Sequence, residues 1–348
     1  MAPLPPSPDT IILISGINGY IASHIALCLL QQGYTVRGTS RSASAKDRLI
    51  SGPFKDYAST YQHAVVTDIA APGAFDSAVQ GVHAIIHTAS PIDFSLKTLE
   101  DFVGPAVQGN TSILTSALNH AGPQLQSFVL TSSVAAVVDR WAHPFTEPYA
   151  YSEADWNING PKIASSEPST PASRTALRKP SPSARCGKKA EGLNLTVKPV
   201  WDIYTNNPSL NGKLPPPVGG ASWVDVRDVA EIHAWAAINP DESKGQRYLA
   251  TNGKAPPQAI ADLLREEFPD RDIITEQPGY WYQSRDEEDK EKRGGLFGKK
   301  WGWELEGQSV DAAKMRKALG GGREKELRGY REAVLDTVRA LEGHFGSL

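Results

Sequence analysis

The sequence predicts an α/β fold in which a doubly wound parallel sheet carries a smaller C-terminal lobe. In the first 131 of the 348 residues, short β-rich runs alternate with helical patterns, as in successive βαβ units. A glycine-rich turn follows the first of these runs and opens a helix. The content of 40% hydrophobic and 22% charged residues is typical of an ordinary globular protein.

Five runs of β-forming residues predict the strands of the sheet: residues 11–15, 35–39, 63–66, 84–87 and 127–131. Between the first two runs, residues 21–32 place Ile21, Ile25 and Leu29 on one stripe of a helix. Strands that alternate with helices in this way form a parallel sheet with helices on both faces.

The composition then predicts three regions along the chain. Residues 1–159 form the core, and residues 160–217 are rich in Ser, Pro, Thr, Arg and Lys without a regular period, which predicts a disordered segment. Residues 218–348 regain regular patterning and hold the remainder of the core and the smaller lobe. They include a charge run at 285–293, expected as a solvated face, and an amphipathic stretch at 324–345.

Charge and cysteine content limit the classes of partner. The 36 basic and 39 acidic residues give a net charge of −3, so a small molecule is expected rather than nucleic acid or a membrane. Cys28 and Cys186 are the two cysteines, and the eight histidines lack zinc-site spacing, so neither a disulfide framework nor a metal is expected. Residues 1–10 lack the features of a secretory signal and residues 11–30 are interrupted by polar side chains, which favours a cytoplasmic protein.

The glycine-rich turn has the spacing G-x-x-G-x-x-A at Gly16, Gly19 and Ala22. The first glycine permits a tight turn, the second permits close approach of a pyrophosphate, and the alanine permits close packing of helix on strand. The amide groups at the helix N-terminus then bind the phosphates. A plain strand–helix turn is the alternative, but the βαβ context favours a Rossmann-type dinucleotide site.

The end of the second predicted strand distinguishes the two nicotinamide dinucleotides. NAD sites place an acidic residue there, whereas NADP sites use arginine for the 2′-phosphate. This chain has Arg41 at that position, with Arg37 and Lys46 nearby. NADP(H) is therefore the expected cofactor, and ordinary surface charges are the alternative interpretation.

Six motifs occur in order along the chain: SGINGYIASHI, VRGTSRS, HTASP, LTSSVAAV, WVDVRDVAEIH and VDAAKMRKALG. Together they resemble the extended short-chain dehydrogenases/reductases, in the branch of dihydroflavonol 4-reductase, cinnamoyl-CoA reductase and yeast-type ketone (methylglyoxal) reductases. The resemblance implies an NADPH-dependent reductase that acts on a small or secondary-metabolite carbonyl compound.

The resemblance also implies roles for individual residues. Ser133 matches the serine that hydrogen-bonds the substrate carbonyl, although a strand-end serine that satisfies local backbone groups is the alternative. The positions that match cofactor contacts are Gly16, Asn18, Gly19, Tyr20, Ile21, Arg41, Lys46, Asp68, Ile69, His87, Thr88, Ala89, Ser90, Thr131 and Ser132.

The catalytic pair of the family is missing from this chain. The family uses a tyrosine as general acid, with a lysine four residues later that lowers the tyrosine pKa. Here Tyr149 is followed at that distance by Glu153, Tyr151 by Asp155, and Tyr204 by Pro208. The acidic residues are expected to raise a tyrosine pKa, which is the wrong direction.

A shifted reading frame accounts for the missing pair. Codons that encode residues 175–187, regrouped by one nucleotide, can encode Y-R-A-S-K-T-L-A-E-R-A-M-W, which resembles the catalytic helix of the family. A genuine disordered insertion is the alternative. Two functional hypotheses follow: a carbonyl reductase, and a non-catalytic NADP-binding protein or inactive paralogue. Aromatic candidates for the pocket wall are Trp281, Tyr282 and Trp301.

Overall fold

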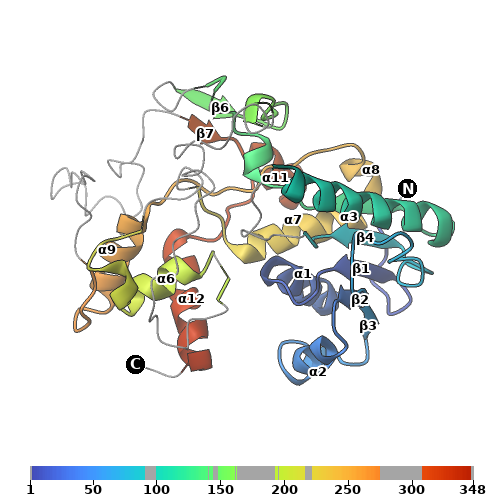
Figure 1. Ribbon diagram of the computed structural model, residues 1–348, viewed down its shortest axis with the longest axis horizontal. Coiled ribbons are helices and arrows are strands. Elements are labelled where there is room, and N and C mark those ends of the chain that lie inside the picture. The colour runs from blue at the N-terminus through green and yellow to red at the C-terminus, as the bar shows by residue number, and fades with distance from the viewer. Residues whose placement is uncertain are drawn as a thin grey trace.

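The computed structural model describes residues 2–90, 99–139, 141–143, 148–160, 162, 193–194, 196–215, 222–274 and 308–345. A five-stranded sheet lies in the N-terminal part (Figure 1) and contains β1 (Ile11–Ser15), β2 (Thr35–Ser40), β3 (Tyr61–Val65), β4 (Ala84–His87) and β5 (Ser127–Leu130). All four strand pairs are parallel, in the order β3-β2-β1-β4-β5. The predicted fold class is confirmed, and every strand begins and ends within two residues of its predicted bounds.

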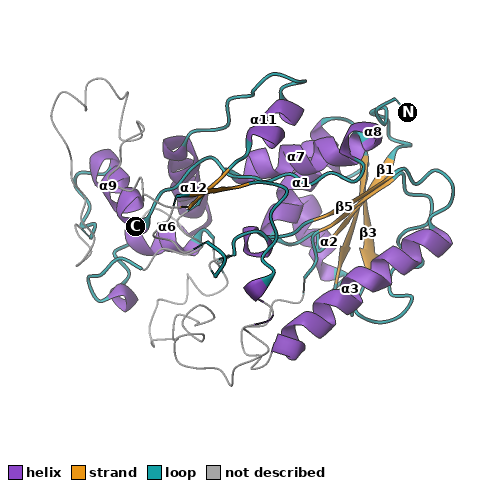
Figure 2. Cartoon of the chain, turned by 90° about the horizontal axis from the view of Figure 1, so that it is seen from above, coloured by secondary structure: helices purple, strands orange, loops and turns teal. Residues whose placement is uncertain are grey.

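Helices cover both faces of this sheet. Figure 2 shows α3 (Leu99–His120) on one side, with α1 (Tyr20–Gln31) and α7 (Val226–Ile238) on the other. Side chains alternate accordingly along β1: Ile12 and Ile14 join the cluster under α1 and α7, whereas Leu13 joins the cluster under α3. Both faces of the strand are thus buried, as in a doubly wound fold.

The chain reverses its direction of strand addition between β1 and β4. After β1 it adds β2 and β3 on one side, then crosses to the other side of β1 for β4 and β5. Such a switch point leaves a crevice at the carboxyl ends of the two central strands, where doubly wound proteins bind ligands. Ser15 and His87 are the register partners at that end.

A second group of helices packs around its own core. It consists of α6 (Lys198–Tyr204), α9 (Pro257–Glu267) and α12 (Tyr330–Phe345). Trp201 and Tyr204 of α6 are buried there against Leu264 and Val338. Part of the segment for which the composition predicts disorder therefore forms a buried helix, because its last residues regain large apolar side chains. Residues 163–192 lie outside the described part of the chain.

The remaining elements are short. Strands β6 (Tyr149–Tyr151) and β7 (Gln308–Val310) form a separate parallel pair. The predicted amphipathic stretch at 324–345 becomes helical only at Tyr330. Before that residue, the backbone amide of Arg328 donates to the Asp228 carboxylate instead of a helical carbonyl. The other helical elements are α2 (Ser44–Ser51), α8 (Pro240–Ser243), α11 (Ala313–Leu319), η1 (Lys55–Tyr57), η2 (Val134–Ala136) and η4 (Pro208–Leu210).

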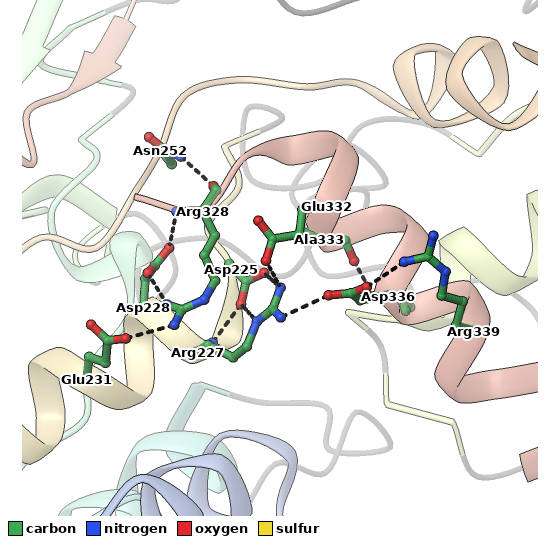
Figure 3. A network of polar contacts seen from close by, with 11 residues as sticks. Asp225, Arg227, Asp228, Glu231, Asn252, Arg328, Glu332, Ala333, Asp336 and Arg339 are labelled. Carbon is green, nitrogen blue, oxygen red and sulfur yellow. Dashed lines mark hydrogen bonds and ion pairs between the residues drawn. The ribbon is translucent and has the colours of Figure 1, made fainter. Parts of the chain in front are cut away.

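An ion-pair network joins α7 to the C-terminal segment (Figure 3). Asp228 is fully buried and accepts the backbone amide of Arg328 at 2.9 Å and its guanidinium at 2.5 Å. The same guanidinium reaches Glu231 at 2.9 Å. One turn earlier, Arg227 reaches Asp336 of α12 at 2.9 Å. Helix α7 thus lies on the sheet and also holds the chain that enters α12.

Candidate active site

The glycine-rich turn connects β1 to α1 in the predicted way. Gly16 has a φ of +69°, and a Cβ at this position would lie 3.2 Å from the backbone of Ala89. The amide of Gly19 donates to the carbonyl of Gly16 at 2.8 Å, and Gly19 is the N-cap of α1. No side chain caps this helix and no acidic residue lies in its first turn. Its first amide groups are therefore available to an anion.

Ser15 joins this turn to the loop after β4. Its fully buried hydroxyl lies 2.7 Å from Nδ1 of His87 and accepts the amide groups of Thr88 and Ala89, each at 3.0 Å. The Ser15 carbonyl accepts the Thr88 hydroxyl at 2.5 Å. Sequence reasoning missed this residue, although its position directly before the glycine turn was a signal that could have found it.

The arginines near the end of β2 play different parts. Arg41 follows the strand and is exposed, as is Lys46 on α2. Arg37 points elsewhere: its guanidinium donates to the carbonyls of Ala78 and Gln80 at 2.8 and 2.6 Å. The prediction that groups Arg37 with Arg41 and Lys46 at the cofactor site is therefore wrong. On the pleated strand β2, the Arg37 side chain contacts the neighbouring turn instead.

The turn after β3 is built from local contacts. The exposed Asp68 accepts the amide of Ala70 at 2.9 Å, which fixes an Asx turn. Ile69 packs beside Gly109 of α3, where an added Cβ would lie 3.1 Å from the isoleucine side chain. Both residues thus follow β3 at the carboxyl edge of the sheet, where β2 separates β3 from β1 and its glycine-rich turn.

The last residue of β4 is a buried histidine, whereas the loop that follows this strand carries an exposed serine. His87 is buried, and desolvation lowers its pKa to about 4, so the imidazole is neutral at pH 7. Ser90, three residues after the end of β4, is exposed. A neutral His87 can exchange a hydrogen bond with Ser15 without placing a charge inside the sheet.

Ser133 lies on an exposed loop at the carboxyl end of β5, after Thr131 and Ser132. Its hydroxyl accepts the amide of Ala135 at 3.2 Å and forms the N-cap of η2. This contact is the local role that was the alternative in the sequence. It uses a lone pair of the hydroxyl, so the hydroxyl proton is still able to donate to a carbonyl oxygen.

The three tyrosines compared with the missing catalytic motif are all engaged elsewhere. The Tyr149 hydroxyl donates to Asp155 at 2.7 Å, and this hydrogen bond raises the pKa of Tyr149. The Tyr151 hydroxyl donates to the carbonyl of Asp139 at 3.0 Å, and burial raises its pKa. Burial, followed by the contact with Glu342, raises the pKa of Tyr204 to about 12. The pKa values of Tyr149 and Tyr151 are raised, as the sequence predicts, but the largest causes differ. The acid that contacts Tyr149 is six residues away rather than four, and burial is the largest cause for Tyr151.

A pocket of about 340 Å³ lies in the same region as Ser133. Its lining includes Asp139, His143, Tyr151 and Trp156. The segment that carries Trp156 is held near the serine loop, since the amide of Asn157 donates to the carbonyl of Ala136 at 2.8 Å. One wall of the pocket is therefore held close to the loop that follows Ser133.

Other sequence predictions lie outside the described residues or concern absences within them. Residues 175–187 and the aromatic candidates Trp281, Tyr282 and Trp301 lie outside the described residues. Among the described residues, acidic, histidine and cysteine side chains form no group that could hold a metal ion. The helices within the described part are all too short or too polar to span a membrane.

Comparison with known proteins gives a consistent set of similarities. Residues 12–155 match the model of the NAD dependent epimerase/dehydratase family. An uncharacterized oxidoreductase of Schizosaccharomyces pombe is 32% identical over 303 residues, which cover 76% of this chain and 85% of that protein. A ketoreductase of Aspergillus niger is 31% identical over 295 residues, covering 74% and 82%. The structure of yeast methylglyoxal/isovaleraldehyde reductase complexed with NADPH has a TM-score of 0.72 at 26% identity, covering 97% and 100%.

Proposed function

This chain belongs to the NAD dependent epimerase/dehydratase family, within the extended short-chain dehydrogenases/reductases, and we propose that it binds NADP(H) and reduces a carbonyl compound. The substrate class is a small or secondary-metabolite aldehyde or ketone. The similarity to the Aspergillus ketoreductase and to the yeast methylglyoxal/isovaleraldehyde reductase complexed with NADPH supports this class.

The observation that carries the proposal is the junction at Ser15. It joins an uncapped helix N-terminus to the loop after β4 at the switch point of the sheet. A Cβ at Gly16 would lie 3.2 Å from Ala89, so a side chain there would push this loop away, and its φ of +69° also disfavours any residue but glycine. This arrangement fits a dinucleotide whose pyrophosphate lies on α1, with Arg41 beside the 2′-phosphate.

In this proposal the cofactor and the residues of the chain have separate roles in the reaction. Bound NADPH supplies a hydride to the carbonyl carbon. Ser133 donates a hydrogen bond to the carbonyl oxygen, which makes the carbon more electrophilic. The tyrosines at 149, 151 and 204 have raised pKa values and other partners, so none of the three is suited to deliver the proton.

The missing tyrosine–lysine pair favours a second candidate, a non-catalytic NADP-binding protein. Two measurements on the full chain distinguish the candidates: NADPH affinity by fluorescence titration, and NADPH oxidation with a panel of aldehydes and ketones. Turnover supports the reductase, and tight binding without turnover supports the second candidate. Absence of NADPH binding would contradict both.

The coding sequence tests the origin of the missing pair. We propose that a frameshift or a misplaced splice junction altered residues 175–187. Codons there that cannot be regrouped to Y-R-A-S-K-T-L-A-E-R-A-M-W would exclude this origin and leave a genuine insertion.

A further inference from the structure

A histidine on α7 contacts the residue at which β5 leaves the sheet. Nε2 of His233 lies 2.9 Å from the hydroxyl of Thr131, which is 102 positions away in the sequence. The other ring nitrogen, Nδ1, lies 2.7 Å from the carbonyl of Val229, one turn earlier on the same helix. The half-buried ring thus bridges the helix backbone and the strand end.

The two contacts fix the tautomer of His233. A carbonyl oxygen only accepts hydrogen bonds, so Nδ1 must carry the proton that is donated to Val229. Nε2 then has a lone pair and accepts the hydroxyl proton of Thr131. The Thr131 hydroxyl therefore has a defined direction.

This contact anchors the loop that presents Ser133. The amide of Thr131 donates to the carbonyl of His87 at 3.0 Å, so Thr131 is held from both β4 and α7. Two residues later, the exposed Ser133 has the local contact with Ala135 described above. The direction in which the loop leaves the sheet therefore depends on Thr131.

Helix α7 also carries the ion pairs to Arg328 and Asp336 (Figure 3). The same helix therefore contacts the C-terminal segment and the strand end before Ser133. We propose that His233 is a positioning residue: it holds Thr131 and thereby sets the place of Ser133 at the carbonyl substrate. This inference rests on the proposed reductase function.

Substitutions at Thr131 test the proposal with little change in shape. Thr131→Val removes the hydroxyl and keeps the volume, whereas Thr131→Ser keeps the hydroxyl. We expect Val, but not Ser, to raise amide hydrogen exchange in residues 131–135 about five- to tenfold, in line with the loss of one hydrogen bond. His233→Phe removes the acceptor and has the same expected effect.

A matched control comes from the other end of β5. The Ser127 hydroxyl donates to the carbonyl of Ala236 on α7 at 3.4 Å, so Ser127→Ala removes a contact between the same two elements. It should leave exchange in residues 131–135 unchanged. Imidazole ¹⁵N shifts give a second readout, since the His233 Nε2 signal should change in Thr131→Val and return in Thr131→Ser.

Kinetics separate positioning from general stability. In the reductase assay, Thr131→Val and His233→Phe should both lower kcat. His233 is not among the predicted cofactor contacts, so in His233→Phe the KM for NADPH should stay within about twofold. If the wild-type chain gives no turnover, the reductase proposal fails. Amide hydrogen exchange and the imidazole ¹⁵N shifts then test the positioning role of His233 without the kinetics. Unchanged exchange at residues 131–135 in Thr131→Val would overturn it, even if His233→Phe fails to fold.

Discussion

The hydroxyl of Ser15 lies 2.7 Å from Nδ1 of His87, at the carboxyl ends of two adjacent strands. The contact joins the glycine-rich turn to the loop after β4, because the same hydroxyl accepts two amide groups of that loop. One buried oxygen thus sets the relative position of the two segments that would enclose a dinucleotide.

Ser15→Ala should weaken both folding and cofactor binding. It leaves two amide groups and a buried imidazole nitrogen without their partner, and each unsatisfied buried group costs about 1–3 kcal/mol. Urea unfolding and NADPH titration measure the two effects. Ser51→Ala is the control, because the exposed Ser51 hydroxyl only donates to Asp47 on the same helix. Unchanged NADPH affinity in a folded Ser15→Ala protein would show that the junction does not shape the binding site.

Gly38→Ala should destabilise the sheet beneath the glycine-rich turn. An added Cβ would lie 2.5 Å from Cγ1 of Ile17 and 2.8 Å from the hydroxyl of Tyr61. Such overpacking costs about 1–3 kcal/mol, measured as a lower free energy of unfolding. Gly343→Ala provides the contrast, since a Cβ there meets open space on a helix and should stabilise slightly. Equal stabilities of the two variants would contradict the close contact at Ile17.

Arg41→Asp should reverse the preference for the phosphorylated cofactor. The change replaces an exposed guanidinium after β2 with a carboxylate, which repels a 2′-phosphate and accepts ribose hydroxyls. Titrations with NADPH and NADH should show a higher affinity for NADPH before the change and for NADH after it. Lys55→Asp makes the same charge change on η1 and should preserve the preference. Equal affinities for both cofactors before and after would remove the role of Arg41.

The parts of this fold that depend on local pattern could be predicted, whereas contacts between distant segments could not. The short runs of β-forming residues predict β1 and β4 with their observed bounds. The role of Ser15 was missed because its partners, His87 to Ala89, lie more than 70 residues away. Arg37 was misplaced for the same reason, since only the folded sheet brings it to the Ala78 carbonyl.

Arg328→Met should be among the more damaging single changes on the C-terminal segment. It leaves the fully buried carboxylate of Asp228 without its cation, and breaking a buried pair in this way costs about 3–5 kcal/mol. Asp228→Asn in the same protein should restore part of the loss. Arg339→Met is the control, because Arg339 is 69% exposed and its partner Asp336 is 37% exposed. Such an exposed pair is worth at most about 1 kcal/mol.

The stability lost in Arg328→Met should also depend on pH. Burial raises the pKa of Asp228 in the folded protein even with the arginine present. A raised folded-state pKa means that the native state binds the proton more tightly than the unfolded state. The deficit of the variant relative to wild type should therefore shrink as pH falls from 7 through the folded-state pKa. Unfolding curves at several pH values measure it, and a pH-independent deficit would contradict an unpaired carboxylate as its cause.

Carbonyl reduction by the chain as it stands should be slow. Loss of a general acid costs about 10²–10⁴-fold, and the lysine that would tune it is missing as well. Replacing residues 175–187 with Y-R-A-S-K-T-L-A-E-R-A-M-W should restore part of the NADPH-dependent rate, because it supplies a tyrosine with a lysine four positions later. Turnover by the unmodified chain that survives Phe at Tyr149, Tyr151 and Tyr204 but is abolished by Ser133→Ala would show that another group delivers the proton. The missing tyrosine–lysine pair would then not be the cause of the low rate. Ser133 itself can polarise a carbonyl, but it lacks the tuned acidity to protonate the alkoxide.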